Sequence, residues 1–392
     1  MLKTKSIFFE MSLISDKFGS ATDLIRLVDN DLFLVGTSKG YIIKYNHHSL
    51  DTPLETLRAC KGSIRRMLLI DNDHCLVCTA KGKLFAVDLT GQQDCGKVKG
   101  SLDAVYTAMT LLSSGPQGVL LALGTEDGDI HCVRLFQEAD LVFHMDTASA
   151  KTLSHHDDYI SELVWVAPKK TLLAISGDGV LSAISVKESK EEITVRVVGQ
   201  SRNYDQDLTA LVLLPAEGKL LAAGMLGWVG MFRWNYWGST CASLKKNIHK
   251  EAPITQLHII DEDLGIALST DGEGLLRLIA TKPLDGAVMI VAQLDESIER
   301  SLVFSNGADR LVIAITASGN CLHPIIVSST VMQKFVQSLS ESLSTVKAQE
   351  NSDDSNLSES DDSDKDEMPE SKRKRATKKN LTMASSFFAD LD

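Results

Sequence analysis

Cysteine is sparse and irregularly placed in this chain of 392 residues. The seven cysteines are odd in number and follow no spaced framework, which disfavours the disulfide-rich secreted domains. No apolar run approaches the ~20 residues that a membrane-spanning helix needs, and Lys3, Lys5 and Glu10 interrupt the apolar start of the chain. We therefore expect reduced cysteines and an intracellular protein, with neither secretion nor membrane anchoring.

Basic side chains are too few for a general nucleic-acid binder. The chain has 40 Lys and Arg against 52 Asp and Glu, a formal net charge of −12 at pH 7. A protein with this balance has no overall attraction for phosphate backbones, so any RNA contact must come from a local patch. Catalytic signatures are missing as well: the sequence has no Gly-rich phosphate loop, nucleophile elbow or paired catalytic acids. It predicts a protein that is not an enzyme and uses no cofactor or metal.

Two short motifs look like parts of metal sites but are better explained as structure. Cys75 and Cys78 lie three residues apart within a predicted strand, so their side chains point to opposite faces and cannot share one zinc ion. The run His155 to Asp158 is interpreted as a turn between repeats, with one His in a buried hydrogen bond. A metal-ligand role for this run is the less favoured alternative.

One pattern recurs seven times along the chain: an apolar run, small residues, a turn with Gly, and a second apolar run. Continuous Leu, Val, Ile and Ala runs suit strands covered on both faces, and Gly supplies the positive φ of a tight hairpin. The turn glycines lie roughly 42 to 51 residues apart, near the period of propeller blades. They are Gly40, Gly82, Gly128, Gly179, Gly227, Gly272 and Gly319.

Further strands flank most of these hairpins. An upstream strand such as residues 160–166 and a more polar downstream strand such as residues 191–198 complete units of four strands. This arrangement predicts an all-β, seven-bladed propeller over residues 1–335, with the segment around Ile7 to Ile14 closing the ring. A two-sheet sandwich or a pair of β domains is the alternative. It is disfavoured because no linker interrupts the chain between Ala21 and Val327.

The repeats are poor examples of the WD40 type. The Trp-Asp pair that often ends the third strand is absent, with Val87-Asp88 and Trp234-Asn235 as the nearest relics. We therefore predict that blade stability rests more on apolar packing than on the Asp-His-Ser-Trp hydrogen-bond network of such repeats. Turn chemistry explains the carboxylates of Asp127, Asp178 and Asp271, which we expect at equivalent hairpin positions.

The fifth hairpin differs from its siblings. Met225, Leu226 and Trp228 stand where the other repeats place Ser, Thr, Asp or Lys. Exposed on the hairpin-tip face, they would form a hot spot for docking a partner; folded inward, they would be ordinary packing, and both interpretations remain open. The aromatic residues within 232–238 are interpreted mainly as blade packing.

The composition changes abruptly after about Ser338. Residues 341–370 are rich in Ser, Asp and Glu and cannot bury enough apolar surface to offset their ordering entropy, so residues 336–392 are predicted to form a disordered acidic and basic tail. Ser358 and Ser363 each precede an acidic residue by three positions, a context that acidophilic kinases accept, and are predicted phosphorylation sites.

The tail also carries two candidate recognition motifs. The basic run is interpreted as a nuclear-localisation signal that binds an import receptor, with contact to RNA phosphates as the alternative. The aromatic terminus is predicted to dock in a partner's groove. The basic residues are Lys372, Arg373, Lys374, Arg375, Lys378 and Lys379, and the docking residues are Phe387, Phe388 and Leu391.

Several segments together resemble the WD repeat-containing protein 55 family, a family of nucleolar propellers. They are His-Asp-Asp-Tyr-Ile at 156–160, Pro-Lys-Lys-Thr-Leu-Leu-Ala-Ile-Ser-Gly-Asp-Gly at 168–179, Phe-x-Trp-Asn at 232–235, Ser-Thr-Asp-Gly at 269–272 and the closing Phe-Phe-Ala-x-Leu. The resemblance implies a nuclear, largely nucleolar scaffold that supports ribosomal RNA production and processing and large-subunit assembly. Its partners would be pre-ribosomal assembly factors, which it would join as a monomer within a larger complex.

A different function from the same fold is the alternative. Other WD propellers serve as substrate receptors of cullin-type ubiquitin ligases. The usual Trp-Asp-x-Arg sequence of such receptors is missing here, so this interpretation ranks below the nucleolar scaffold.

Overall fold

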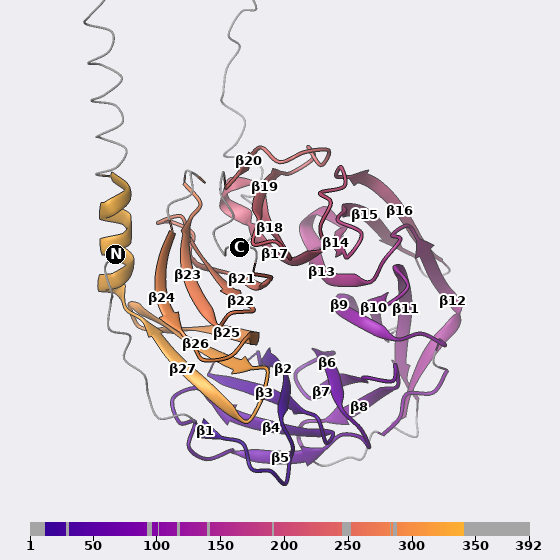
Figure 1. Cartoon of the computed structure of the whole chain (residues 1–392). Coiled ribbons are helices and arrows are strands. Elements are labelled where there is room, and N and C mark those ends of the chain that lie inside the picture. Colours follow the sequence, from indigo (N-terminus) through magenta and orange to yellow (C-terminus); the bar gives the residue numbers. More distant parts are fainter. Residues whose placement is uncertain are drawn as a thin grey trace, which may run out of the picture.

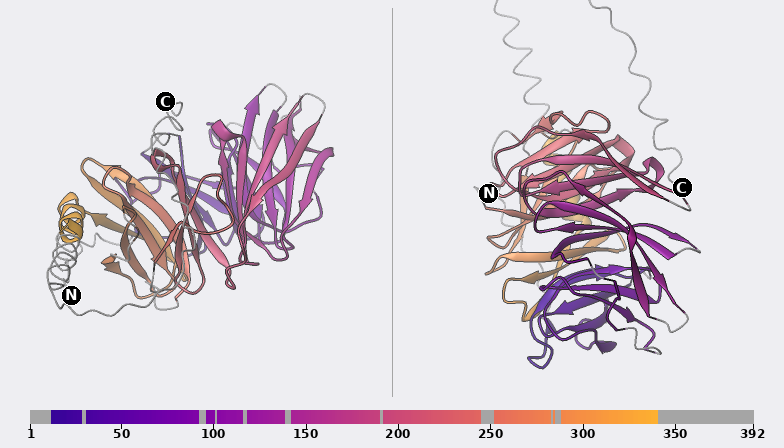
Figure 2. Two further views of the ribbon diagram at one scale, coloured as in Figure 1. Left: turned by 90° about the horizontal axis from the view of Figure 1, so that it is seen from above. Right: turned by 90° about the vertical axis from the view of Figure 1, so that its right-hand side faces the viewer.

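The computed structural model shows a ring of seven antiparallel sheets around a central axis (Figure 1). It describes residues 12–28, 31–91, 96–100, 102–115, 118–138, 142–189, 192–244, 252–282, 284 and 288–340, to which all structural statements here apply. Figure 2 shows the same ring from two other sides. The predicted seven-bladed β-propeller is confirmed.

Blades 1 to 6 each consist of strands that follow one another in the chain, and the first strand of each lies nearest the axis (Figure 1). Blade 1 contains β2 (Ala21–Arg26), β3 (Leu32–Thr37), β4 (Tyr41–Asn46) and β5 (Glu55–Arg58). Blade 2 contains β6 (Ile64–Leu69), β7 (His74–Thr79) and β8 (Leu84–Asp88). Blade 3 contains β9 (Tyr106–Gly115), β10 (Gly118–Thr125), β11 (Asp129–Gln137) and β12 (Phe143–Ser154).

The remaining blades follow the same order around the ring. Blade 4 contains β13 (Ile160–Val166), β14 (Thr171–Ser176), β15 (Leu181–Glu188) and β16 (Ile193–Gln200). Blade 5 contains β17 (Leu208–Leu214), β18 (Lys219–Gly224), β19 (Val229–Arg233) and β20 (Ala242–Ser243). Blade 6 contains β21 (Ile254–Asp261), β22 (Ile266–Asp271), β23 (Leu275–Ala280) and β24 (Val288–Gln293). Short 3-10 helices, η1 (Ala167–Lys169) and η2 (Pro215–Glu217), join the first two strands of blades 4 and 5.

Blade 7 joins the two ends of the propeller. Three of its strands, β25 (Ile298–Asn306), β26 (Asp309–Thr316) and β27 (Cys321–Val327), come from the end of the repeat region. The fourth, β1 (Ser12–Leu13), comes from the start of the chain and pairs antiparallel with β27. The predicted closing strand is therefore confirmed for Ser12 to Ile14, the part of the 7–14 segment that the structure describes.

The core is divided among the spaces between neighbouring blades. Each of the seven spaces holds its own apolar cluster, and the cluster between blades 2 and 3, for example, joins Leu76 to Leu121 and Leu123. The second strands are buried along nearly their whole length, as in β14. Burying one such Leu contributes about 1.5–3 kcal/mol, which supports the prediction that apolar packing dominates blade stability.

The hairpin glycines have the backbone conformation that the sequence pattern requires. Gly128 has a φ of +84°, and a Cβ placed on it would lie 2.3 Å from the His156 carbonyl oxygen of the next blade's entry loop. Any larger residue at this position would be strained and would collide with backbone. In blade 6 the predicted turn glycine was wrong: Gly274, with a φ of +81°, makes the turn, and Gly272 has no positive φ.

This correction changes the interpretation of Asp271. Asp271 lies three residues before the turn glycine Gly274 and is the last residue of β22. The corresponding residue of blade 3 is Thr125, the last residue of β10. The Thr125 hydroxyl accepts the backbone N–H four residues on, and the Asp271 carboxylate accepts the corresponding N–H of Leu275 at 2.8 Å. The predicted equivalence of Asp271 with Asp127 and Asp178 is therefore wrong, because the blade 6 turn lies two residues later than assumed.

Polar contacts join neighbouring blades around the axis. The Met67 N–H of β6 donates to Asp23 Oδ2 of β2 at 2.7 Å, and the Leu211 N–H of β17 donates to Glu162 Oε2 of β13 at 2.6 Å. The Thr107 hydroxyl of β9 donates to the Ile160 carbonyl of β13 at 2.6 Å. These hydrogen bonds tie inner strands that no backbone ladder connects.

A helix over residues 329–340 follows β27 and was not expected from the sequence. It lies beside β24 and β27 at the outside of the ring (Figure 1). Met332, Phe335 and Leu339 bury their side chains in the apolar cluster of blades 6 and 7. This packed helix continues to residue 340.

Candidate interaction face

One face of the ring is formed by the seven hairpin tips together with the loops that enter each blade. Hydrogen bonds join the tips to the entry loops. In blade 5 the Met225 N–H of the tip donates to the Asp207 carbonyl of the entry loop, and in blade 4 the Gly177 N–H donates to the Tyr159 carbonyl. We call this surface the tip face. Since loops held on a rigid scaffold are favoured binding elements, it is the candidate functional site.

The run His155 to Asp158 forms the entry loop of blade 4. His156 is buried, and its Nδ1 lies 2.9 Å from Asp178 Oδ2 of the blade 4 tip. Burial raises the pKa of Asp178, but hydrogen bonds from His156 and from backbone N–H groups outweigh it and lower the pKa overall. The predicted turn with one His in a buried hydrogen bond is confirmed, and this blade keeps part of the polar network that the other repeats have lost.

The tip of blade 5 divides between exposed and packed side chains. Met225 and Leu226 are 41% and 47% exposed, so they stand at the surface of the tip face. Trp228 is half-buried, with its ring centroid 4.6 Å from that of Tyr204 in the blade's entry loop. Of the two interpretations left open by the sequence, exposure holds for Met225 and Leu226 and packing for Trp228.

The second aromatic cluster packs within blade 5. Phe232, Trp234 and Trp237 are buried in the cluster between blades 4 and 5, and the two indole rings meet edge to face at 5.0 Å. The predicted packing role is confirmed for these three residues. Tyr236 differs, because it is 69% exposed.

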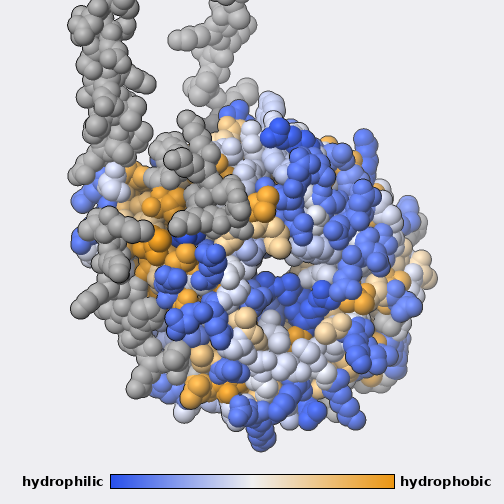
Figure 3. Space-filling model, in the orientation of Figure 1, coloured by the Kyte–Doolittle hydropathy of each residue, from blue (hydrophilic) through white to orange (hydrophobic). Residues whose placement is uncertain are grey.

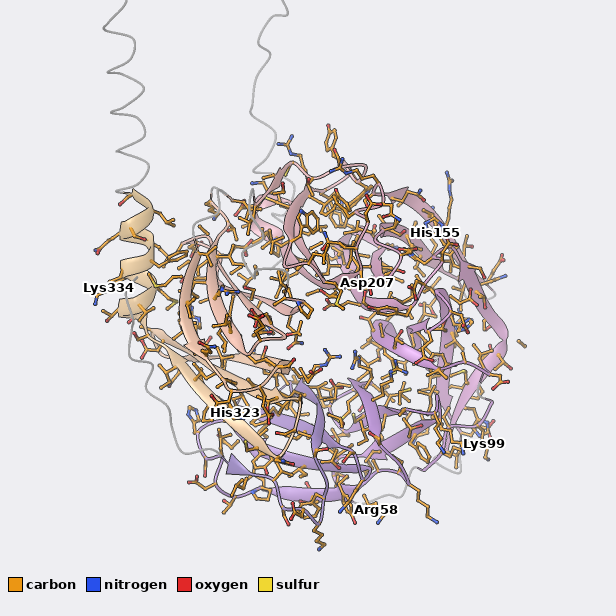
Figure 4. All side chains as sticks on the ribbon, in the orientation of Figure 1. Arg58, Lys99, His155, Asp207, His323 and Lys334 are labelled. Carbon is orange, nitrogen blue, oxygen red and sulfur yellow. The ribbon has the colours of Figure 1, made fainter. Side chains whose placement is uncertain are left out.

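Charge is unevenly distributed around the tip face. Blades 1 and 2 present exposed lysines, Lys39 and Lys81, at their tips. Blade 4 and the loop into blade 5 present exposed carboxylates, Asp157, Asp158 and Asp205, around the apolar tip. Figure 4 places Asp207 close to the axis and His155 farther out. The loop into blade 5 also carries the exposed Arg202, whose guanidinium lies over the Tyr204 ring, so carboxylates and one arginine surround the apolar tip.

Comparison with known proteins points to a single family. A WD repeat-containing protein 55 homolog of Aedes aegypti is 27% identical over 73% of this chain and 56% of its own length. WD repeat-containing protein 55 of Rattus norvegicus is 25% identical over 56% of this chain and 52% of its own length. The sequence fits a divergent member of the WD repeat-containing protein 55 family.

Other relatives extend this likeness to fungi. WD repeat-containing protein JIP5 of Coprinopsis cinerea is 28% identical over 55% of this chain and 50% of its own length. The chain thus spans about half the length of the curated relatives it matches. No protein-family model matches the sequence. The similarity to these WD-repeat proteins supports a role in protein–protein interaction.

The two cysteines of the Cys-x-x-Cys motif are separated as predicted. Cys75 is buried between blades 1 and 2, whereas Cys78 is buried between blades 2 and 3. Burial raises the pKa of Cys75 to about 12 and that of Cys78 to about 11. Neutral thiols on opposite faces of one strand cannot share a metal ion.

One group of candidate metal ligands was missed by the sequence analysis. The side-chain ligand atoms of Asp31, His47 and His48 lie within 4.8 Å of one another. These residues flank the start of β3 and the end of β4 in blade 1. His47 Nδ1 is 3.1 Å from the Asp31 main-chain oxygen, so hydrogen bonding between the start of β3 and the end of β4 already accounts for the position of His47. Among the described residues, no helix has the length and apolar character needed to cross a lipid bilayer.

The candidate residues of the tail lie outside the described part of the chain. They are the phosphorylation sites Ser358 and Ser363, the basic run from Lys372 to Lys379, and the docking residues Phe387, Phe388 and Leu391. Their roles remain predictions.

Proposed function

We propose that this protein is a non-enzymatic scaffold that holds assembly factors on precursors of the large ribosomal subunit in the nucleolus. In this role it supports the production and processing of ribosomal RNA. The proposal is supported by the WD-repeat relatives, which fit a protein-interaction role, and by the acidic and basic tail of the sequence.

The observation that carries the proposal is the exposed apolar tip of blade 5. Met225 and Leu226 expose about half of their side chains on a rigid hairpin, and Met is enriched in interface cores. Asp205 is exposed in the loop that is hydrogen-bonded to this tip, and Asp157 is exposed in the entry loop of blade 4. A protein partner with an apolar side chain flanked by Lys or Arg would complement both features, since charge complementarity selects partners and speeds their association.

The tail has a delivery and tethering role in this proposal. The run Lys372 to Arg375 with Lys378 and Lys379 binds an import receptor, and the closing Phe387, Phe388 and Leu391 dock on an assembly factor. Phosphorylation at Ser358 and Ser363 adds negative charge between the propeller and the basic run. Partners are proteins, and RNA is approached through them.

Imaging tests the location. Tagged wild-type protein is expected in nucleoli, and a variant with alanine at Lys372, Arg373, Lys374 and Arg375 is expected in the cytoplasm. A variant with alanine at Lys39 and Lys81, which lie on the propeller and not in the tail, is the matched control and is expected in nucleoli. Cytoplasmic signal for all three proteins contradicts the proposal.

A further inference from the structure

The central channel holds a cluster of charged side chains that the proposed scaffold role does not use. A cavity of about 380 Å³ lies on the axis and is lined by residues of the inner strands. In Figure 3 hydrophilic residues border the hollow at the centre of the ring. The channel therefore offers a polar site that is open to solvent.

The charges occupy equivalent positions in the blades. In every blade the pairing of the first strand with the second shifts by one residue near the start of the first strand. In most blades the first paired residue after this shift lines the central cavity. Sequence reasoning missed this ring because the positions become visible only when the blades are superposed. They are Asp23, Arg66, Ala108, Glu162, Ala210, Gln256 and Arg300.

The two arginines of this ring are unequally neutralised. Arg300 Nε lies 3.3 Å from Asp23 Oδ1. Arg66 donates to the main-chain oxygen of Arg65 at 2.9 Å, and no carboxylate of the described residues lies within 4.0 Å of its guanidinium. Burial, and then the charge of Arg300, lower the pKa of Arg66 to about 10. Arg66 stays charged at neutral pH, so the pair of arginines retains positive charge.

The other polar residues do not cancel this charge. Burial raises the pKa of Glu162 to about 7, against the opposing effects of its hydrogen bond from Leu211 and the charges of Arg300 and Arg66. Burial and the charge of Arg26 lower the pKa of His258 to about 4, which keeps it neutral. Near neutral pH, Glu162 is therefore only partly charged and His258 adds no charge to the ring.

We propose that the channel binds the phosphate group of a small phosphorylated compound, with the phosphate between Arg66 and Arg300. Guanidinium forks match phosphate oxygens in geometry and charge. A dianionic phosphate presents oxygens to both arginines. A dicarboxylate such as malonate gains less, because each of its planar carboxylates presents only two oxygens and Asp23 already supplies one such group to Arg300. The site is independent of the tip face and of the scaffold role.

Glu162 makes this binding depend on pH. Its carboxylate repels an anion and its protonated form does not, so for a ligand of constant charge Glu162 weakens binding as the pH rises through about 7. Replacing Glu162 with Gln keeps an oxygen to accept the Leu211 N–H and mimics the protonated form. The groups that face Glu162 are Asp23 of β2, Arg66 of β6, Gln256 and His258 of β21, and Arg300 of β25.

The test is titration calorimetry of the purified full chain with pyrophosphate, inorganic phosphate and malonate at about pH 6 and about pH 8. Pyrophosphate and phosphate are expected to bind more tightly than malonate. Because these ligands also ionise in this pH range, the effect of Glu162 is taken from the affinity of the wild type relative to Glu162→Gln, which is expected to fall from about pH 6 to about pH 8. Arg66→Gln is expected to weaken pyrophosphate binding by about 10-fold or more. Arg58→Gln, at an exposed position of β5, is expected to match the wild type.

The outcomes separate this site from weaker explanations. Equal binding by the wild type, Arg66→Gln and Arg58→Gln means an adventitious ion only and overturns the proposal, as does no binding or tighter binding of malonate. If Arg66→Gln does not fold, Arg66→Lys keeps the charge and removes the fork, and a partial loss of affinity supports the site. The localisation of the protein in cells does not depend on phosphate binding. Nucleolar imaging therefore tests the scaffold proposal separately from this site.

Discussion

The Arg277 guanidinium lies 3.0 Å from the Asp271 carboxylate within blade 6, and both side chains are almost completely buried. The pair replaces the neutral Thr that Thr37, Thr79 and Thr125 supply at the corresponding position of blades 1 to 3. Burial lowers the pKa of Arg277, and the adjacent Asp271 opposes that effect. Each charge is therefore tolerated because the other is present.

Removing one member of this pair is expected to be costly. Arg277→Leu leaves a buried carboxylate without its cation and should reduce the free energy of unfolding by about 3–5 kcal/mol. The double variant Asp271→Thr with Arg277→Leu restores the arrangement of the other blades and should recover most of the loss. Urea denaturation of both variants measures this, and a double variant as unstable as Arg277→Leu refutes the interpretation.

Glu162 should make the stability of the propeller depend on pH. Its pKa is raised to about 7 in the folded chain, above the value of about 4.3 for an unfolded chain. Between these two pKa values the folded state binds a proton that the unfolded chain lacks. The stability that this proton contributes is complete below about pH 4 and is lost as the pH rises to about 7. The free energy of unfolding falls by no more than about 1.4 kcal/mol per pH unit.

Urea denaturation at several pH values in this window checks the claim. Glu162→Gln cannot titrate and is expected to show a smaller fall in stability with rising pH than the wild type. Parallel curves for the two proteins would mean that Glu162 titrates normally in the folded state.

The turn glycines are expected to be far less replaceable than other glycines. Gly128→Ala forces Ala into a φ of +84° and sets its Cβ 2.3 Å from a backbone oxygen, so a loss of at least about 1–3 kcal/mol is expected. Gly115 has no positive φ, and a Cβ there meets nothing within 4 Å, so Gly115→Ala should change stability by less than about 0.5 kcal/mol. Thermal unfolding of the two variants measures the difference, and similar losses would argue against the turn geometry.

Much of the fold could be predicted because hairpins repeat. The apolar runs and their glycines gave the blade number, and the opposite faces of Cys75 and Cys78 followed from strand periodicity. The turn in blade 6 was misplaced because Asp271-Gly272 imitates a turn sequence, whereas Gly274 has the positive φ. Local sequence cannot distinguish a turn at Gly272 from a turn at Gly274, because the difference depends on which groups the Asp271 side chain binds in the folded blade.

The candidate sites were less predictable for the same reason. Whether Trp228 packs or projects depends on Tyr204, 24 residues away in the chain, against which its ring lies. The ring of Asp23, Arg66 and Arg300 combines residues from blades 1, 2 and 7. Such combinations arise only when the ring closes, so no single segment reveals them.

Substitutions in the blade 5 tip should distinguish residues that bind a partner from residues that stabilise the fold. Met225→Ser with Leu226→Ser alters exposed side chains and is expected to leave the free energy of unfolding within about 0.5 kcal/mol of the wild type for each change. Trp228→Ala removes the ring that packs on Tyr204 and should cost up to about 3 kcal/mol. Urea denaturation compares the two, and a large loss for the serine variant would assign its residues to packing and not to docking.

The most direct test of the scaffold role is sedimentation of nuclear extracts on sucrose gradients. The tagged full chain is expected to migrate with precursors of the large ribosomal subunit. The Met225→Ser and Leu226→Ser double variant, although folded and nuclear, is expected to remain near the top of the gradient. Wild-type protein that also stays at the top, or a double variant that migrates with the precursors as the wild type does, would contradict the account.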